Sequence, residues 1–183
     1  MNFRVRGVSL EISFWFAAVM TLLLLLNSQT GAAECFLLCV LHEIGHLVPM
    51  LMFKAKPKKI QLGYFGMKIV TGHKLLSPIK EIIIAASGPA VNLTLAAILF
   101  FEGNKSSAML SLGLGLFNLL PVPLLDGGRI LTQLTENRKA LKIAGFVCCG
   151  ALLLFGIAAI CSSRNFTFIA VSLYLLIGML TFS

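Results

Sequence analysis

Charged side chains are scarce in this sequence. Only 12% of its 183 residues are charged, whereas a soluble domain of this size carries about 25%. Hydrophobic residues make up 58% of the chain, and the mean hydropathy is +0.94. Several apolar stretches approach the ~20 residues that a helix needs to cross a bilayer. The composition therefore excludes an ordinary soluble domain and predicts an integral membrane protein.

Acidic residues are few as well, with seven against fifteen lysines and arginines, for a net charge of +8. The basic residues fall between apolar segments, as juxtamembrane charges do, so we expect no nucleic-acid partner. The five cysteines all lie in or beside apolar segments, which predicts reduced thiols and not a disulfide framework. They are Cys35, Cys39, Cys148, Cys149 and Cys161.

The apolar segments predict an all-α polytopic membrane protein with about six transmembrane helices. The predicted spans cover residues 10–27, 32–53, 79–101, 108–134, 143–161 and 166–182. We expect residues 1–183 to form a single integral-membrane domain with no PDZ or nucleotide-sensing module.

The longest polar connection, residues 54–80, carries seven lysines. Within it Ile60, Leu62 and Tyr64 alternate with polar or glycine residues, which predicts a β-strand or short hairpin after the second span. Such a ribbon could merely join two spans, or its edge could pair with an unwound substrate segment.

Lysines and arginines also predict the orientation. With a cytoplasmic amino terminus, twelve of them face the cytoplasm and two face the opposite side, which is the bias of multi-pass membrane proteins. The twelve are Arg4, Arg6, Lys54, Lys56, Lys58, Lys59, Lys68, Lys74, Lys80, Arg138, Lys139 and Lys142. We therefore expect a cell-membrane protein with both termini in the cytoplasm.

Histidine is rare, and two of the three histidines stand four residues apart in the second predicted span. On a helix, His42 and His46 leave the same face, so both imidazoles can reach one ion. Glu43 follows the first histidine, where a carboxylate can take a proton from an attacking water. The stretch His42–His46 therefore predicts a metal site buried at membrane depth.

Asp126 is the candidate for a third ligand. It lies inside the fourth predicted span between leucines and glycines, where a carboxylate is costly unless it meets a cation or a hydrogen-bonding cluster. Its depth is similar to that of His46, since each precedes a cytoplasmic helix end by about two turns. The alternative is a pairing with Arg129, three residues on. The matched depth favours the ligand interpretation.

Three stretches together resemble the site-2 protease family of intramembrane zinc metalloproteases. They are His42–His46, Ala86–Asn92 (a small-Gly-Pro-x-x-Asn element) and Asn118–Arg129. Their order and the six-span layout are similar to the compact branch of the family, which includes the stage IV sporulation protease.

The resemblance implies one Zn²⁺ per chain, held by His42, His46 and Asp126, with Glu43 as the catalytic base. The implied reaction is hydrolysis of a peptide bond in a membrane-spanning or membrane-tethered protein, near the cytoplasmic face. Asn92 and Asn118 would bind substrate backbone or the oxyanion; their alternative is an interhelical hydrogen bond.

The resemblance also implies that the strand around residues 60–70 clamps extended substrate, and that a regulatory membrane protein could act as a partner. Two other functions remain open, a membrane metal-ion transporter and an inactive scaffold with the protease fold. The glutamate within the histidine motif disfavours a transporter, because transport needs no general base.

Overall fold

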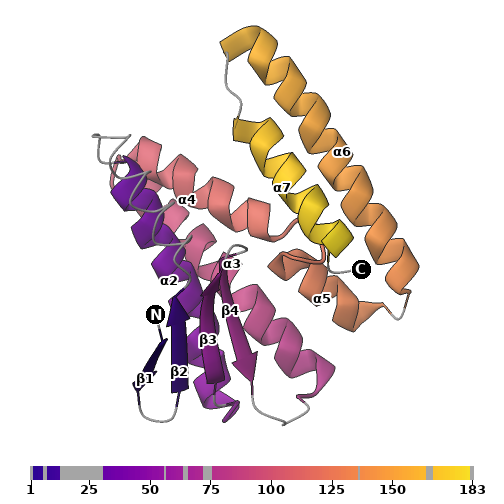
Figure 1. The fold of residues 1–183 in the computed structure, drawn as a ribbon. Helices are drawn as coiled ribbons and strands as arrows, with labels where there is room; N and C mark the ends of the chain where they lie inside the picture. The colour runs from indigo at the N-terminus through magenta and orange to yellow at the C-terminus, as the bar shows by residue number, and fades with distance from the viewer. Residues whose placement is uncertain are drawn as a thin grey trace. The chain divides into compact units, whose positions relative to one another are not determined.

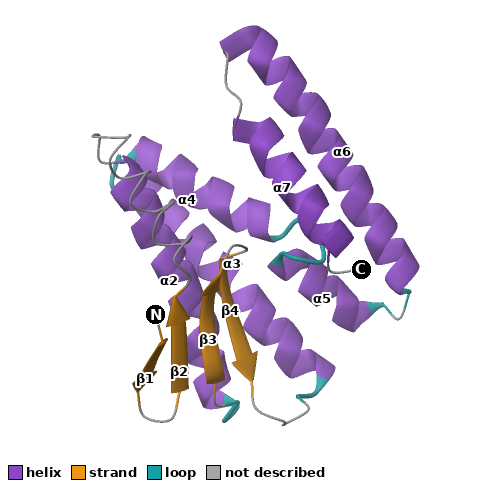
Figure 2. Ribbon diagram, in the orientation of Figure 1, coloured by secondary structure: helices purple, strands orange, loops and turns teal. Residues whose placement is uncertain are grey.

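The computed structural model describes residues 2–5, 8–12, 31–55, 57–63, 66–71, 76–135, 137–163 and 167–181. Helices make up most of this described part (Figure 2). In chain order the elements are β1 (Asn2–Val5), β2 (Val8–Ile12), α2 (Gly31–Met52), β3 (Pro57–Gly63), β4 (Gly66–Thr71), α3 (Pro78–Phe101), α4 (Lys105–Asn118), α5 (Asp126–Leu134), α6 (Arg138–Ser163) and α7 (Thr167–Thr181) (Figure 1). The chain divides into two compact units, residues 1–116 and 117–183.

The first unit contains a four-stranded sheet with the strand order β1-β2-β3-β4 (Figure 1). The pairs β1–β2 and β3–β4 are antiparallel, and the central pair β2–β3 is parallel. Gly63 of β3 stands opposite Gly66 of β4. The residues for which the sequence predicts a strand or hairpin therefore form half of a larger sheet. The other half comes from the start of the chain.

The predicted beginning of the first span, near residue 10, is wrong. Leu10 lies in β2, opposite Phe3 of β1 on one side and opposite Ile60 of β3 on the other. The sequence does carry the signal, because residues 8–12 alternate apolar and polar side chains as a strand does. The rest of this predicted span, from residue 13 on, lies outside the described residues up to residue 30.

Three helices of the described chain are long and apolar enough to cross a membrane. These segments are Ala33–Met52, Pro78–Phe101 and Arg138–Ala158, and α7 contributes a shorter apolar stretch, Val171–Leu180. Helices α2 and α3 begin and end within one residue of the predicted spans 32–53 and 79–101. Helix α6 begins at Arg138, earlier than the predicted start at residue 143.

The fourth predicted span, 108–134, consists of two separate helices, α4 and α5. Residues 119–125 between them are not helical. Pro121 and Pro123 lie in this connection, and proline has no N–H to donate to a helix. A single interrupted helix is therefore replaced by a helix, an irregular connection and a second helix that begins at Asp126.

The core of the second unit consists of Val122, Cys149, Leu175 and Met179, which are all buried. These side chains come from the α4–α5 connection, from α6 and from α7, so the connection is packed and not a solvent loop. The four cysteines whose side chains are described are free thiols: Cys35, Cys39, Cys148 and Cys149.

Candidate metal centre

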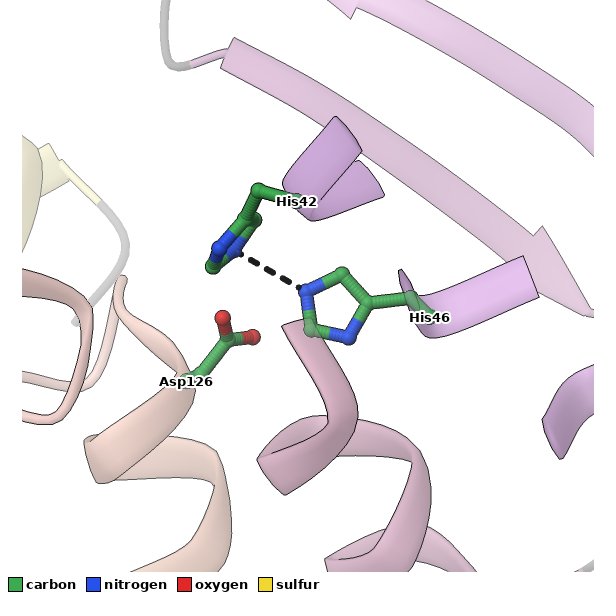
Figure 3. A group of neighbouring side chains, drawn as sticks. All are labelled: His42, His46 and Asp126. Atoms are coloured by element: carbon green, nitrogen blue, oxygen red, sulfur yellow. Dashed lines mark hydrogen bonds between the residues drawn. The ribbon is translucent and has the colours of Figure 1, made fainter. Parts of the chain in front are cut away.

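His42 and His46 face each other on α2 (Figure 3). Both are buried, with 6% and 5% of their surface exposed. Their Nε2 atoms are 3.2 Å apart, and the ring planes are nearly perpendicular, at 86°. The four-residue spacing on one helix places the two imidazoles on the same face, as the sequence predicts.

A backbone carbonyl fixes the orientation of His46. Its Nδ1 lies 2.7 Å from the carbonyl oxygen of Ile84 on α3. A carbonyl only accepts hydrogen bonds, so Nδ1 of His46 carries the proton and donates. In the neutral ring Nε2 then holds the lone pair, which is the arrangement of metal-binding histidines whose other nitrogen is held by a second group.

The two Nε2 atoms have the spacing of ligands to one zinc ion. Zn–N bonds of ~2.0–2.1 Å at a tetrahedral angle place two ligand nitrogens about 3.3 Å apart. The observed separation is 3.2 Å. The separation of the two nitrogens therefore fits a shared zinc ion.

Glu43 follows His42 on α2 and is half-buried. One residue along a helix turns the side chain by about 100°, so Glu43 lies beside the histidine face and does not share it. This is the relation that the sequence predicts for a base next to the metal ligands and not among them.

Asp126 is the first residue of α5, in the second unit, and is 7% exposed. The guanidinium of Arg129 pairs with it: Nη1 donates to Oδ1 at 3.4 Å. The pairing that the sequence leaves open as an alternative is therefore present. It is compatible with metal binding, because a carboxylate has two oxygens with about four acceptor sites.

The two predicted substrate-binding asparagines lie in different surroundings. Asn92 on α3 is fully buried, and its backbone oxygen accepts a hydrogen bond from Oγ of Ser111 on α4 at 2.8 Å. Asn118 is the last residue of α4, is half-buried and belongs to the second unit.

Sequence reasoning missed two contributors to the histidine pair, and both come from α3. One is the carbonyl of Ile84, which has no sequence signal because every residue carries a carbonyl. The other is Gly88, which lies against both imidazoles. Gly88 belongs to the small-Gly-Pro-x-x-Asn element, but that pattern does not indicate which side chains the glycine contacts.

A helical membrane protein with a buried, preoriented histidine pair is the class that these features define. The family model for peptidase family M50 matches residues 104–157. A zinc metalloprotease of Methanocaldococcus jannaschii is 29% identical over 205 aligned residues, which cover 96% of this chain. A Synechocystis protein, provisionally named a zinc metalloprotease, is 31% identical over 73% of this chain. The solved site-2 protease of M. jannaschii matches with a TM-score of 0.71 and 25% identity, covering 99% of this chain and 94% of that one.

The sequence matches and the structural match all point to peptidase family M50, the site-2 protease family. Its relatives there are membrane zinc metalloproteases. The matched regions span 58% of the M. jannaschii relative's own length and 37% of the Synechocystis protein's.

Proposed function

We propose that this chain is an intramembrane zinc metalloprotease that hydrolyses a peptide bond of a membrane-spanning or membrane-tethered protein. One observation carries the proposal. Two buried imidazoles present their Nε2 atoms 3.2 Å apart on a helix of membrane-crossing length, with a glutamate between them in sequence. The spacing of the nitrogens suits zinc, and the intervening glutamate suits hydrolysis more than transport.

Zinc has three protein ligands in this proposal: His42, His46 and Asp126 (Figure 3). Each of the three is buried, and each offers a ligand atom that zinc accepts, two imidazole nitrogens and one carboxylate oxygen. Three protein ligands are the usual set of a catalytic zinc, and we expect one ion per chain. A zinc ion held there supplies Lewis-acid polarisation of the scissile carbonyl and acidifies water.

Glu43 takes the proton of the attacking water and passes it to the nitrogen of the leaving amine. The carbonyl of Ile84 keeps Nδ1 of His46 protonated, so that Nε2 stays available as a ligand. Asn92 and Asn118 donate hydrogen bonds to the substrate backbone or to the developing oxyanion. The family matches and the residue types support these roles.

The substrate is a membrane protein cut near the cytoplasmic face, and both termini of the chain lie in the cytoplasm. An extended substrate segment pairs with the edge of β4, whose other edge is paired with β3. A regulatory membrane protein can control this access. The charge distribution along the chain and the position of β4 at the end of the sheet support this part of the proposal.

The test replaces Glu43 by Gln, which keeps the side-chain shape and removes the base. We expect zinc content to stay at one ion per chain while cleavage of co-expressed single-span proteins is lost. Glu102→Gln is the matched control, because Glu102 is exposed at the end of α3, and it should cleave normally. Unchanged cleavage in Glu43→Gln would overturn the proposal. Transport of zinc into vesicles by both the wild type and Glu43→Gln would favour a transporter.

A further inference from the structure

Helices α2 and α3 cross with their backbones in direct contact. A Cβ atom on Gly45 of α2 would lie 2.9 Å from the carbonyl oxygen of Ser87 and 3.1 Å from Cα of Gly88. Non-bonded carbon atoms normally lie about 3.5–4.0 Å apart, so there is no room for a side chain at this position. Small residues at a crossing point allow membrane helices to approach this closely.

At the same crossing, the backbone of Gly88 lies against the imidazoles. A Cβ atom on Gly88 would overlap Nε2 and Cε1 of His46 and would lie 2.8 Å from Nε2 of His42. These two nitrogens lie 3.2 Å from each other. A side chain on Gly88 would therefore enter space that the two rings already occupy around their Nε2 atoms.

The preceding turn of α3 holds His46 from its other side. The carbonyl oxygen of Ile84, four residues before Gly88, accepts the hydrogen bond from Nδ1 of His46 at 2.7 Å. It also accepts a hydrogen bond from Oγ of Ser87 at 2.7 Å. One face of α3 thus anchors one nitrogen of His46 and leaves room for the other nitrogen at Gly88.

We propose that Gly88 is a positioning residue of the metal site. Its missing side chain keeps the Nε2 atoms of His42 and His46 directed at a common point, and any side chain there turns both rings away from a shared ion. The inference rests on the proposed function only in taking the two histidines as metal ligands.

The first measurement is zinc affinity of the full purified chain, by competition with a chromophoric chelator. Gly88→Ala should weaken zinc binding about 10- to 100-fold or more, the range seen when groups that orient metal ligands are removed. The absorption spectrum of bound Co²⁺ should change with it. Gly113→Ala on helix α4 is the matched control, because a Cβ at this position meets no atom within 4 Å. This variant should bind zinc as the wild type does.

The second measurement separates positioning from ordinary helix packing, and it also works if Gly88→Ala folds poorly. The thermal unfolding of the metal-free chain is compared for Gly88→Ala in two backgrounds, the wild type and His42→Ala/His46→Ala. If the added methyl clashes with the imidazoles, the drop in Tm should be large in the first background and mostly absent in the second. Equal drops would mean that Gly88 serves only the helix crossing.

Wild-type zinc affinity in Gly88→Ala would overturn the inference and leave the proposed function standing. Failure of the wild type itself to bind zinc would instead overturn the proposed function. The two failures are therefore distinguishable in one titration.

Discussion

Asn92 carries a buried amide that no residue in the described part of the chain hydrogen-bonds. The side chain is fully buried on α3, and neither its nitrogen nor its oxygen has a hydrogen-bond partner among the described residues. An unsatisfied buried polar group costs about 1–3 kcal/mol. A chain that keeps such a group gives up stability, which is common where a side chain is needed for function. This cost supports the proposed role of Asn92 in holding substrate.

Replacing Asn92 by Leu separates stability from function. Leucine has the same branching and number of side-chain heavy atoms and no polar atoms, so we expect the free energy of unfolding to rise by about 1–3 kcal/mol while cleavage falls. Thermal unfolding and substrate cleavage measured on the same preparation check both parts. Ser111→Ala should lower stability by about 1 kcal/mol, because Oγ of Ser111 makes a hydrogen bond to the backbone oxygen of Asn92. Normal cleavage by Asn92→Leu would remove Asn92 from the site.

At the scale of single residues, sequence reasoning succeeds where covalent geometry determines the outcome. His42 and His46 meet because four residues make about one helical turn, and that holds in any helix. The contacts of Ile84 and Gly88 depend instead on where α3 crosses α2, 38 and 42 positions away from His46 in sequence. No local pattern encodes such a crossing, so these two contributors could not be predicted.

At the scale of elements, long apolar helices were predictable and short elements were not. Helices α2 and α3 end within one residue of prediction because continuous apolar runs have clear limits. The strands β1 and β2 have only four and five alternating residues, which is a weak signal beside the longer apolar run that follows β2. Pro121 and Pro123 indicate an interruption between α4 and α5. They do not indicate that the segment divides into two separate helices.

The α4–α5 connection passes directly under the first turn of α5. A Cβ on Gly127 would overlap the carbonyl of Leu119, and one on Gly128 would overlap the carbonyl of Val122. The two glycines therefore allow the connection to pack against the turn that carries Asp126. This packing defines where the Asp126 carboxylate is presented within its own unit.

Gly128→Ala should disturb this packing. Overpacking typically costs about 1–3 kcal/mol, so we expect a lower free energy of unfolding. Zinc affinity should fall as well if Asp126 is a ligand, because the turn that carries it must shift. Gly150→Ala in α6 is the matched control, since a Cβ there meets nothing within 4 Å. If Gly128→Ala is as stable as this control, the α4–α5 connection shifts to accept the added methyl group at no cost in stability, and the prediction is wrong.

At the scale of the whole molecule, the path of the chain between α3 and α6 decides the orientation of everything after it. Helix α4 has 14 residues and α5 has nine. Each is shorter than the ~20 residues that cross a bilayer as one helix. A crossing over residues 105–135 therefore needs α4, the irregular connection and α5 together. Backbone groups freed in such a broken segment are tolerated only where protein or water satisfies them.

Thiol labelling tests this crossing directly. In a chain whose five cysteines are replaced by serine, Lys105→Cys and Lys139→Cys, made separately, place one thiol at the first residue of α4 and one in the first turn of α6; both positions are exposed. The proposed orientation puts twelve of the basic residues on the cytoplasmic side, so we expect a membrane-impermeant maleimide to label residue 105 on intact cells. Residue 139 should be labelled only after permeabilisation. Both thiols react in denatured lysate, which controls for their reactivity.

Labelling of both positions from the same side would mean that α4 and α5 enter and leave the membrane by one face. The carboxyl-terminal helices would then have the opposite orientation.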